Sequence, residues 1–161
     1  FAFTFTNDGN HNFSARTDEV HKVFDVNYFG LASVLESTVS WAAKNKVSGL
    51  RVVNILSNSL KTLNASNGHY IASKSAVETL TRYYAKHFSE YLSVNCVAPG
   101  LMKSRLTATR FDNSEKKIID LTPLGRLASP EEISELVSYF VISSPLSVCG
   151  QTIFVDGGRT L

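Results

Sequence analysis

The sequence predicts an α/β fold in which one parallel β-sheet lies between two layers of helices. Two observations support this prediction. Short segments rich in β-branched residues alternate with long segments in which apolar residues recur at helical spacing. Residues 50–56 and 92–98 are also almost continuously apolar, as is typical of parallel strands that helices cover on both faces. Right-handed crossovers between such strands then place helices on both sides of the sheet.

Four strands are predicted, at residues 1–5, 50–56, 92–98 and 151–155. The first, third and fourth are followed by sequences that form turns, namely Asn7-Asp8-Gly9, Pro99-Gly100 and Gly157-Gly158. The carboxyl ends of parallel strands meet at one edge of a sheet, and ligands bind beyond that edge in open α/β folds. We therefore expect the loops after these four strands to lie together and to form the functional site.

Three long helices are predicted between the strands. The first covers residues 17–46 and is expected to bend midway, the second covers residues 70–91, and the third begins after the N-cap Ser129 and extends to about residue 143. Residues 101–123 are mixed in character, contain a short helix near 114–121 and are the candidate for a mobile flap. In the second helix the side chains available for burial are Ile71, Ala72, Ala76, Leu80, Tyr84 and Phe88.

Length and composition indicate one soluble globular domain over residues 1–161. The 16 Lys and Arg residues nearly balance the 14 Asp and Glu residues, which does not favour a nucleic-acid partner. No apolar run approaches the roughly 20 residues that span a bilayer, so no membrane partner is expected. The amino-terminal segment has no basic region typical of a signal peptide, and we expect a cytoplasmic protein. Cys96 and Cys149 are interpreted as reduced packing residues, and no metal site is expected because no His or Cys pair has ligand spacing.

Three polar residues stand where the predicted fold would place chemistry. Ser57 directly follows the strand at 50–56, and Tyr70 and Lys74 are four residues apart at the start of the next helix, so they share one helix face. A cation beside a tyrosine favours the phenolate and lowers the pKa of the phenol from its ordinary value near 10. A tyrosine altered in this way can act as an acid and a base near neutral pH. A Tyr and a Lys at this spacing also occur by chance on ordinary solvated helix faces.

Further motifs resemble the classical short-chain dehydrogenase/reductase family over essentially the whole chain. Residues 70–74 (YIASK) match its Y-x-A-S-K, and residues 155–158 (VDGG) match its V-D-G-G. Other stretches resemble further motifs of the family and occur in the family's order: residues 25–30 (DVNYFG), 51–57 (RVVNILS), 94–100 (VNCVAPG), and 123–126 (PLGR) with 130–133 (PEEI). The resemblance implies a three-layer Rossmann-like parallel sheet, present in part as strands four to seven of the family's fold.

The resemblance also implies an activity and its residues. Tyr70 would be the acid and base in the NAD- or NADP-dependent interconversion of a small-molecule carbonyl and a secondary alcohol, and Ser57 would bind the reacting oxygen. Lys74 would bind the nicotinamide ribose and lower the pKa of Tyr70, and Asn27 would support a water that links Lys74 to solvent. Asn27 could instead only cap or kink its helix. The catalytic set implied is Asn27, Ser57, Tyr70 and Lys74, and the cofactor-binding set is Asn7, Gly9, Tyr70, Lys74, Pro99, Gly100, Met102 and Ser104.

The family's glycine-rich dinucleotide-binding segment has no counterpart in this sequence, which resembles the family from its fourth strand onward. Asp8 would also place a negative charge beside the cofactor. Three explanations remain open: a fragment of a longer active enzyme, a truncated inactive product, and a chain completed by another polypeptide. We expect the strand at 1–5 to be covered by a second copy or by a separate amino-terminal piece, since exposed apolar edge strands tend to pair.

The alternative to an oxidoreductase is a catalytically inactive dimerisation or binding module that uses the two long helices at residues 17–46 and 70–91 as an interface. The resemblance implies a homodimer or a homotetramer under either hypothesis. The substrate is not predicted, because the flap at 101–123 matches no particular member of the family. The choice between NAD and NADP is not predicted either, because in the family it normally resides in the part that has no counterpart in this sequence.

Overall fold

The computed structural model describes residues 17–63, 68–103 and 115–161 and confirms an α/β fold. Within these residues three strands, β1 (Leu50–Ile55), β2 (Leu92–Pro99) and β3 (Thr152–Val155), form a parallel sheet in the order β1-β2-β3. Asn54 pairs with Cys96, which in turn pairs with Thr152, so these three residues lie on one line across the sheet. The predicted strand at 1–5 lies outside the described residues.

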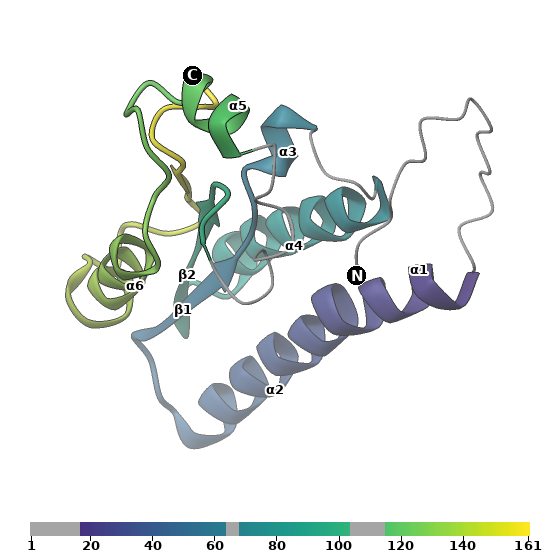
Figure 1. Cartoon of the computed structure of the whole chain (residues 1–161). Coiled ribbons are helices and arrows are strands. Elements are labelled where there is room, and N and C mark those ends of the chain that lie inside the picture. The colour runs from purple at the N-terminus through teal and green to yellow at the C-terminus, as the bar shows by residue number, and fades with distance from the viewer. Residues whose placement is uncertain (1–16, 64–67, 104–114) are drawn as a thin grey trace.

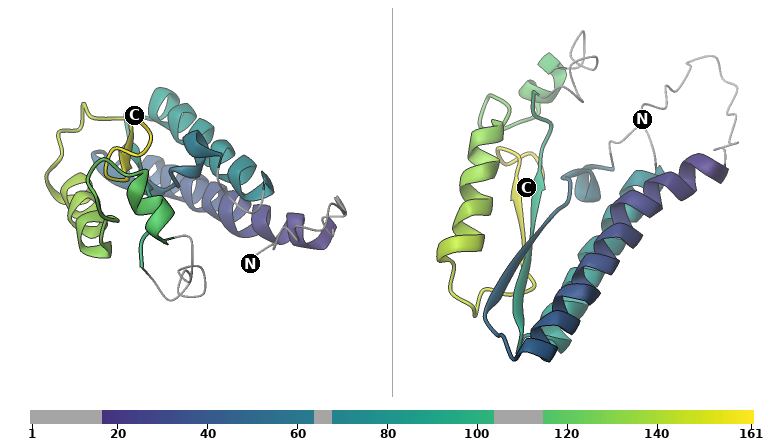
Figure 2. Two further views of the ribbon diagram at one scale, coloured as in Figure 1. Left: turned by 45° about the horizontal axis from the view of Figure 1, so that its top comes forward. Right: turned by 90° about the horizontal axis from the view of Figure 1, so that it is seen from below.

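Helices cover both faces of the sheet, as the sequence predicts (Figures 1 and 2). α4 (Gly68–His87) and α2 (Gly30–Asn45) cover one face of the sheet. The π-helical turn η1 (Asp25–Phe29) joins α2 to α1 (Thr17–Phe24), which packs against α4 and extends beyond the sheet (Figure 2). The opposite face is covered by α6 (Pro130–Ser138), which continues as a second π-helical turn, η3 (Tyr139–Ser143). The right-hand view of Figure 2 shows α6 on one side of the sheet and α2 with α4 on the other.

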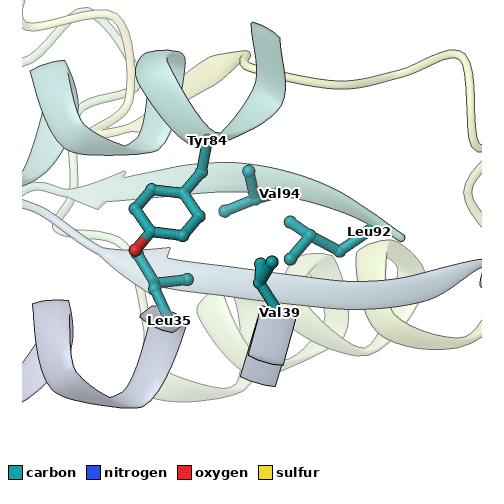
Figure 3. Packing of buried hydrophobic residues seen from close by; sticks show 5 residues of the cluster. All are labelled: Leu35, Val39, Tyr84, Leu92 and Val94. Atoms are coloured by element: carbon teal, nitrogen blue, oxygen red, sulfur yellow. The ribbon is translucent and has the colours of Figure 1, made fainter. Parts of the chain in front are cut away.

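The apolar core explains why these elements pack as they do. Between the sheet and the helices α2 and α4, one cluster joins all three of these elements and is drawn in Figure 3; its buried members are Leu35, Val39, Tyr84, Leu92 and Val94. On the α6 side, a second cluster contains Val97, Ala128, Ile133 and Phe140. Because β2 lies between the two clusters, all eight of its residues are buried.

One expectation about β1 is wrong. The sequence predicts a strand covered on both faces, yet Asn54 is the only buried residue of the six and Ile55 is 44% exposed. The reason is position: among the described strands β1 has a neighbour on one side only, whereas β2 has a neighbour on each side. An apolar run in the sequence therefore does not distinguish the central strand of this sheet from β1.

The helices differ from prediction in their boundaries and in the face that α4 buries. α4 begins two residues before the predicted start and ends four residues before the predicted end. Its buried side chains are Ser73, Val77, Thr81 and Tyr84, whereas Ala72, which we expected to be buried, is exposed. The apolar pattern is misleading here because Ser73 and Thr81 satisfy their hydroxyls inside the core, through bonds to Tyr70 O and Val77 O.

Two short helices complete the described fold. α3 (Ser59–Thr62) lies in the segment that we predicted to be a loop, directly after Ser57, and α5 (Glu115–Asp120) falls within the short helix predicted at 114–121. Figure 1 shows α3, α5 and the carboxyl terminus at the same end of the sheet. That end is the one where the strands finish.

Candidate active site

The segments that follow the three strands lie together at the carboxyl edge of the sheet. The backbone amide of Asn58 donates to the Pro99 carbonyl at 2.8 Å, and the backbone amide of Gly100 donates to the Val155 carbonyl at 2.9 Å. These two bonds join the segment after β1 to the end of β2, and the segment after β2 to the end of β3. The expectation that the loops gather at one edge is confirmed for these three; the loop after residue 5 lies outside the described residues.

A buried carboxylate holds this edge together. Asp156 is 6% exposed and accepts from the Asn58 side chain at 3.3 Å and from the Gly158 amide at 3.1 Å. Gly100 lies directly against it, since a Cβ at this position would come within 2.9 Å of the Asp156 Cβ. Gly100 thus allows the segments after β2 and β3 to approach closely.

Ser57 is half-buried and lies two residues after the end of β1. Its Oγ accepts two hydrogen bonds from Ser59, one from the backbone amide at 3.2 Å and one from the hydroxyl at 2.9 Å. The first turn of α3 therefore positions the Ser57 hydroxyl. The sequence places this serine correctly after a strand but does not reveal the helix that holds it.

Lys74 lies beside the strand that carries Ser57. Its ammonium donates to the carbonyl of Ile55, two residues before Ser57, at 2.8 Å, and lies 5.8 Å from the centre of the Tyr70 ring. Burial, which removes part of the side chain from water, lowers the pKa of Lys74 from 10.5, and its interaction with Cys96 opposes this effect. The structure thus brings Lys74 and the half-buried Tyr70 ring to the end of β1.

Asn27 lies at the centre of the π-helical turn η1, which interrupts the long helix that we predicted over residues 17–46. The turn is closed by a bond from the Gly30 amide to the Asp25 carbonyl, which adds one residue to the helical turn. The Asn27 side chain donates to the Ser73 hydroxyl at 3.0 Å, and that hydroxyl donates to the Tyr70 carbonyl at 2.8 Å. Asn27 is thereby linked to the backbone of Tyr70 through a fully buried serine.

The structure locates some of the predicted cofactor-binding residues and does not describe the others. Pro99 is buried at the end of β2, Gly100 follows it at the carboxyl edge, and the Met102 side chain packs against the apolar cluster under α6. Asn7, Gly9 and Ser104 lie outside the described residues.

Four residues of this edge were missed at the level of sequence: Asn58, Ser59, Ser73 and Asp156. Each is buried and each makes a side-chain bond that shapes the site. Ser73 and Asp156 stand inside motifs that we recognised, so those motifs were the available signal. Asn58 and Ser59 carried no signal, because their partners are set by the short helix α3.

The described residues hold neither a metal-ligand cluster nor a helix that could span a membrane. No group of three or more His, Cys, Asp or Glu side chains there could hold a metal ion. Across residues 17–63, 68–103 and 115–161, no helix combines the length and the apolar character needed to cross a membrane.

Comparison with known proteins identifies the family. The model of the family described as enoyl-(acyl carrier protein) reductase matches residues 2–160. A tropinone reductase homolog of Arabidopsis thaliana is 36% identical over 120 residues, which are 72% of this chain and 46% of that protein. The chain belongs to the short-chain dehydrogenase/reductase family.

Solved structures of dehydrogenases have the same fold. A gluconate 5-dehydrogenase from Burkholderia cenocepacia, in complex with NADP and tartrate, superposes with a TM-score of 0.83 at 25% identity, covering 91% of this chain and 58% of that one. A 4-hydroxyisoleucine dehydrogenase complexed with NADH gives a TM-score of 0.83 at 27% identity, covering 89% and 60%. The chain spans about half the length of the curated short-chain dehydrogenase/reductases that it matches. The partial Rossmann-like fold predicted from the motifs is thus confirmed.

Proposed function

We propose that the protein is an NAD(P)-dependent oxidoreductase that interconverts a carbonyl group and a secondary alcohol. The observation that supports this proposal best is the position of Lys74. Its ammonium is held half-buried at the carboxyl edge of the sheet, on the carbonyl of Ile55 and 5.8 Å from the Tyr70 ring. A cation next to a phenol favours the phenolate, and partial burial strengthens that electrostatic effect.

Each member of the proposed catalytic set has one role. Tyr70 gives a proton to the carbonyl oxygen during reduction and takes a proton from the alcohol during oxidation. Ser57 donates a hydrogen bond to the same oxygen and so stabilises the negative charge that develops on it. Asn27, bound to Ser73, positions the first turn of α4 and supports a water that links Lys74 to solvent.

The residues at this edge suit a nicotinamide ribose. Within the described residues the Lys74 ammonium makes one hydrogen bond, to Ile55, which leaves two of its three N–H donors for ribose hydroxyls. We propose that Tyr70 also binds the ribose, that Pro99, Gly100, Met102 and Ser104 bind the carboxamide, and that Asn7 and Gly9 line the site. The cofactor, when bound, supplies or accepts the hydride. The complexes of related dehydrogenases with NADP and with NADH support this class without separating the two.

We also propose that the protein assembles as a homodimer or a homotetramer. Four large apolar side chains along η1 and α2 support this: Val26, Phe29, Val34 and Trp41 are 76%, 55%, 62% and 54% exposed. Exposed apolar patches of this kind mark interaction surfaces. The same surface favours the second candidate function, an inactive dimerisation or binding module.

Two free cysteines, one of them buried, fit a reducing compartment and thus a cytoplasmic location.

The decisive experiment measures cofactor binding and turnover with the protein at its full natural length. We expect NADH or NADPH to raise the melting temperature, because a ligand at 100 times its Kd stabilises the folded state by about 2.7 kcal/mol. A panel of ketones and secondary alcohols then reports turnover through the absorbance of the reduced nicotinamide. Tyr70→Phe should lower kcat by at least about 100-fold and leave the fold unchanged.

Tyr83→Phe is the matched control, since Tyr83 lies on the same helix and is 51% exposed. Full activity in Tyr70→Phe would contradict the proposed chemistry. The absence of both a thermal shift and turnover, together with a dimer by sedimentation that Trp41→Ser disrupts, would favour the binding module.

A further inference from the structure

The side chain of Ser57 makes an unusual pair of contacts for a serine at a strand end. Both the amide and the hydroxyl of Ser59 donate to the same atom, Ser57 Oγ, at 3.2 and 2.9 Å. A hydroxyl group has one O–H donor and two acceptor lone pairs. With both lone pairs occupied by Ser59, the Ser57 hydroxyl has only its own proton left to offer.

We propose that Ser59 is a positioning residue that makes Ser57 a hydrogen-bond donor aimed at the oxygen of the substrate. This inference rests on the proposed function, in which Ser57 binds the reacting oxygen. A serine free to rotate would spend part of its time accepting a bond or facing solvent. Two fixed donors from Ser59 remove those alternatives and orient the remaining O–H before the substrate binds, which is the arrangement that stabilises developing negative charge best.

Ser59 is itself held firmly enough to act in this way. It is 5% exposed and is the first residue of α3, and its carbonyl accepts from the Leu63 amide at 3.0 Å. The residue before it, Asn58, binds the Pro99 carbonyl through its amide and Asp156 through its side chain. The short helix is thus anchored to the ends of β2 and β3, so the Ser59 hydroxyl is fixed relative to the sheet.

The neighbouring polar side chains do not duplicate this role. The Asn58 side chain donates to Asp156, and the Lys74 ammonium donates to Ile55. Within the described residues, both hydrogen bonds of Ser57 Oγ come from Ser59. The Ser59 hydroxyl is therefore the group whose removal changes the environment of the Ser57 hydroxyl most directly.

A double-mutant cycle on the protein at its full natural length tests the proposal, with NAD(P)H-dependent carbonyl reduction as the assay. We expect Ser57→Ala to lower kcat by about 100-fold, as removal of one oxyanion donor does. Ser59→Ala should lower kcat by about 5-fold with little change in the KM for the carbonyl substrate, since one orienting hydrogen bond is lost. In the Ser57→Ala background, Ser59→Ala should have no further effect on kcat.

Two further variants separate positioning from folding. Ser59→Cys keeps the shape of the side chain but is a weak donor, so it should reproduce the loss in kcat at a stability close to that of the wild type. Ser93→Ala removes a hydroxyl of matched burial, 4% exposed against 5%, whose bond goes to the Val148 carbonyl in another part of the molecule. It should lower the melting temperature and leave kcat within about 2-fold of the wild type.

The outcomes are distinguishable. One outcome is a wild-type enzyme that turns over while Ser59→Ala lowers kcat by the same factor in the wild type and in Ser57→Ala. That result would overturn the positioning role and leave the proposed function intact. A kcat of Ser59→Ala and Ser59→Cys equal to that of the wild type would do the same. A wild-type protein with no turnover on any carbonyl or alcohol of the panel would overturn the proposed function and this inference with it.

Discussion

The two ends of the sheet use buried polar residues in different ways. At the amino end, the hydroxyl of Ser93 and the side-chain amide of Asn95 both donate to the Val148 carbonyl, and the Asn95 side chain accepts from the backbone amide of Gln151. Asn95 also donates to the Ser93 hydroxyl at 3.3 Å, so both side chains of this pair end on the same backbone carbonyl. At the carboxyl end, side chains bind one another: Ser59 to Ser57, and Asn58 to Asp156. Lys74 adds a cation with two N–H donors beyond the one that it gives to Ile55.

This difference separates buried polar groups that stabilise the fold from polar groups that form a functional site. Buried polar groups that end on backbone partners tie a loop to the sheet and have no capacity left for a ligand. Polar groups that hold each other in place while keeping a donor directed outward form a site. On this argument, substitutions at the amino end should lower stability without changing kcat, and substitutions at the carboxyl end should change activity first.

The largest expected effect is on activity, in Lys74→Met. We expect kcat/KM to fall by at least about 100-fold, because the proposed cation beside Tyr70 is lost. The free energy of unfolding at pH 7 should stay the same or rise, since a half-buried charge no longer has to be desolvated. Enzyme assays and urea unfolding measure the two quantities.

The same variant should change the pH dependence of stability. Burial lowers the pKa of Lys74 in the folded protein from 10.5, so near that pH the unfolded chain binds the proton more tightly. Wild-type stability should therefore gain a contribution as the pH rises toward 10.5, and Lys74→Met should lack it. Lys86→Met, at an exposed position of the same helix, is the control for the loss of a lysine and should leave activity unchanged.

The largest expected loss of stability is at the amino end, in Asn95→Ala. Asn95 is 2% exposed, and its removal leaves the Gln151 amide unpaired and a small cavity under the loop before β3. We expect the free energy of unfolding to fall by about 2–3 kcal/mol, and kcat per folded molecule to stay within about 2-fold of the wild type. The exposed Asn45, which binds the Trp41 carbonyl, is the control, and Asn45→Ala should cost less than about 0.5 kcal/mol. A kcat per folded molecule of Asn95→Ala that lies more than about 2-fold below the wild-type value would contradict the contrast between the two ends of the sheet.

A smaller loss of stability, combined with a loss of activity, is expected for Gly100→Ala. The added Cβ would lie 2.9 Å from the Asp156 Cβ and 3.0 Å from its Cα, so the segment after β3 must shift. We expect a loss of about 1–3 kcal/mol and a lower affinity for NAD(P)H, measured by titration. Gly68→Ala is the control, because a Cβ there meets no atom of the described residues within 4 Å. Equal behaviour of the two variants would show that the close approach at Gly100 is unimportant.

The smallest expected effect is at the start of α6, where a polar cluster has a purely structural role. Glu132 accepts from the backbone amide of Ser129 and pairs with both terminal nitrogens, Nη1 and Nη2, of the Arg126 guanidinium. The Arg126 pair, followed by the Ser129 amide, lowers the pKa of Glu132 from 4.5 to about 2. Because the folded-state pKa is depressed, this contribution to stability is present above pH 4.5 and is lost as the pH falls through about 2.

Glu132→Gln should therefore lower the melting temperature slightly at pH 7 and by progressively less as the pH approaches 2. Thermal unfolding followed by circular dichroism over this pH range checks it. Glu135→Gln, at an exposed position of the same helix, should leave the melting temperature unchanged. A constant difference between Glu132→Gln and the wild type at all pH values would show that the ion pair does not titrate as described.

Much of the fold follows from local patterns in the sequence. The three described strands follow from β-branched runs at 50–56, 92–98 and 151–155. The long helices follow within a few residues from the spacing of apolar residues, and the start of the third helix also follows from Ser129-Pro130. The parallel orientation follows because each crossover contains a helix. The two crossovers step in the same direction along the sheet with α4 and α6 on opposite faces (Figure 2), so they have opposite hands and the expectation that both are right-handed is wrong. The family also follows from short motifs read in order, since every motif is a contiguous stretch of the chain.

What only the tertiary structure decided is which side chains meet. Ser73 and Thr81 face the core of α4 while Ala72 does not, because the rotation of a helix about its axis is set by the surfaces that it packs against. Ser59 reaches Ser57, Asn58 reaches Asp156 and Lys74 reaches Ile55 through contacts between segments that sequence patterns treat separately. Local periodicity determines which elements form, whereas the partners of a buried polar group depend on packing between elements, and that packing is what positions the candidate site.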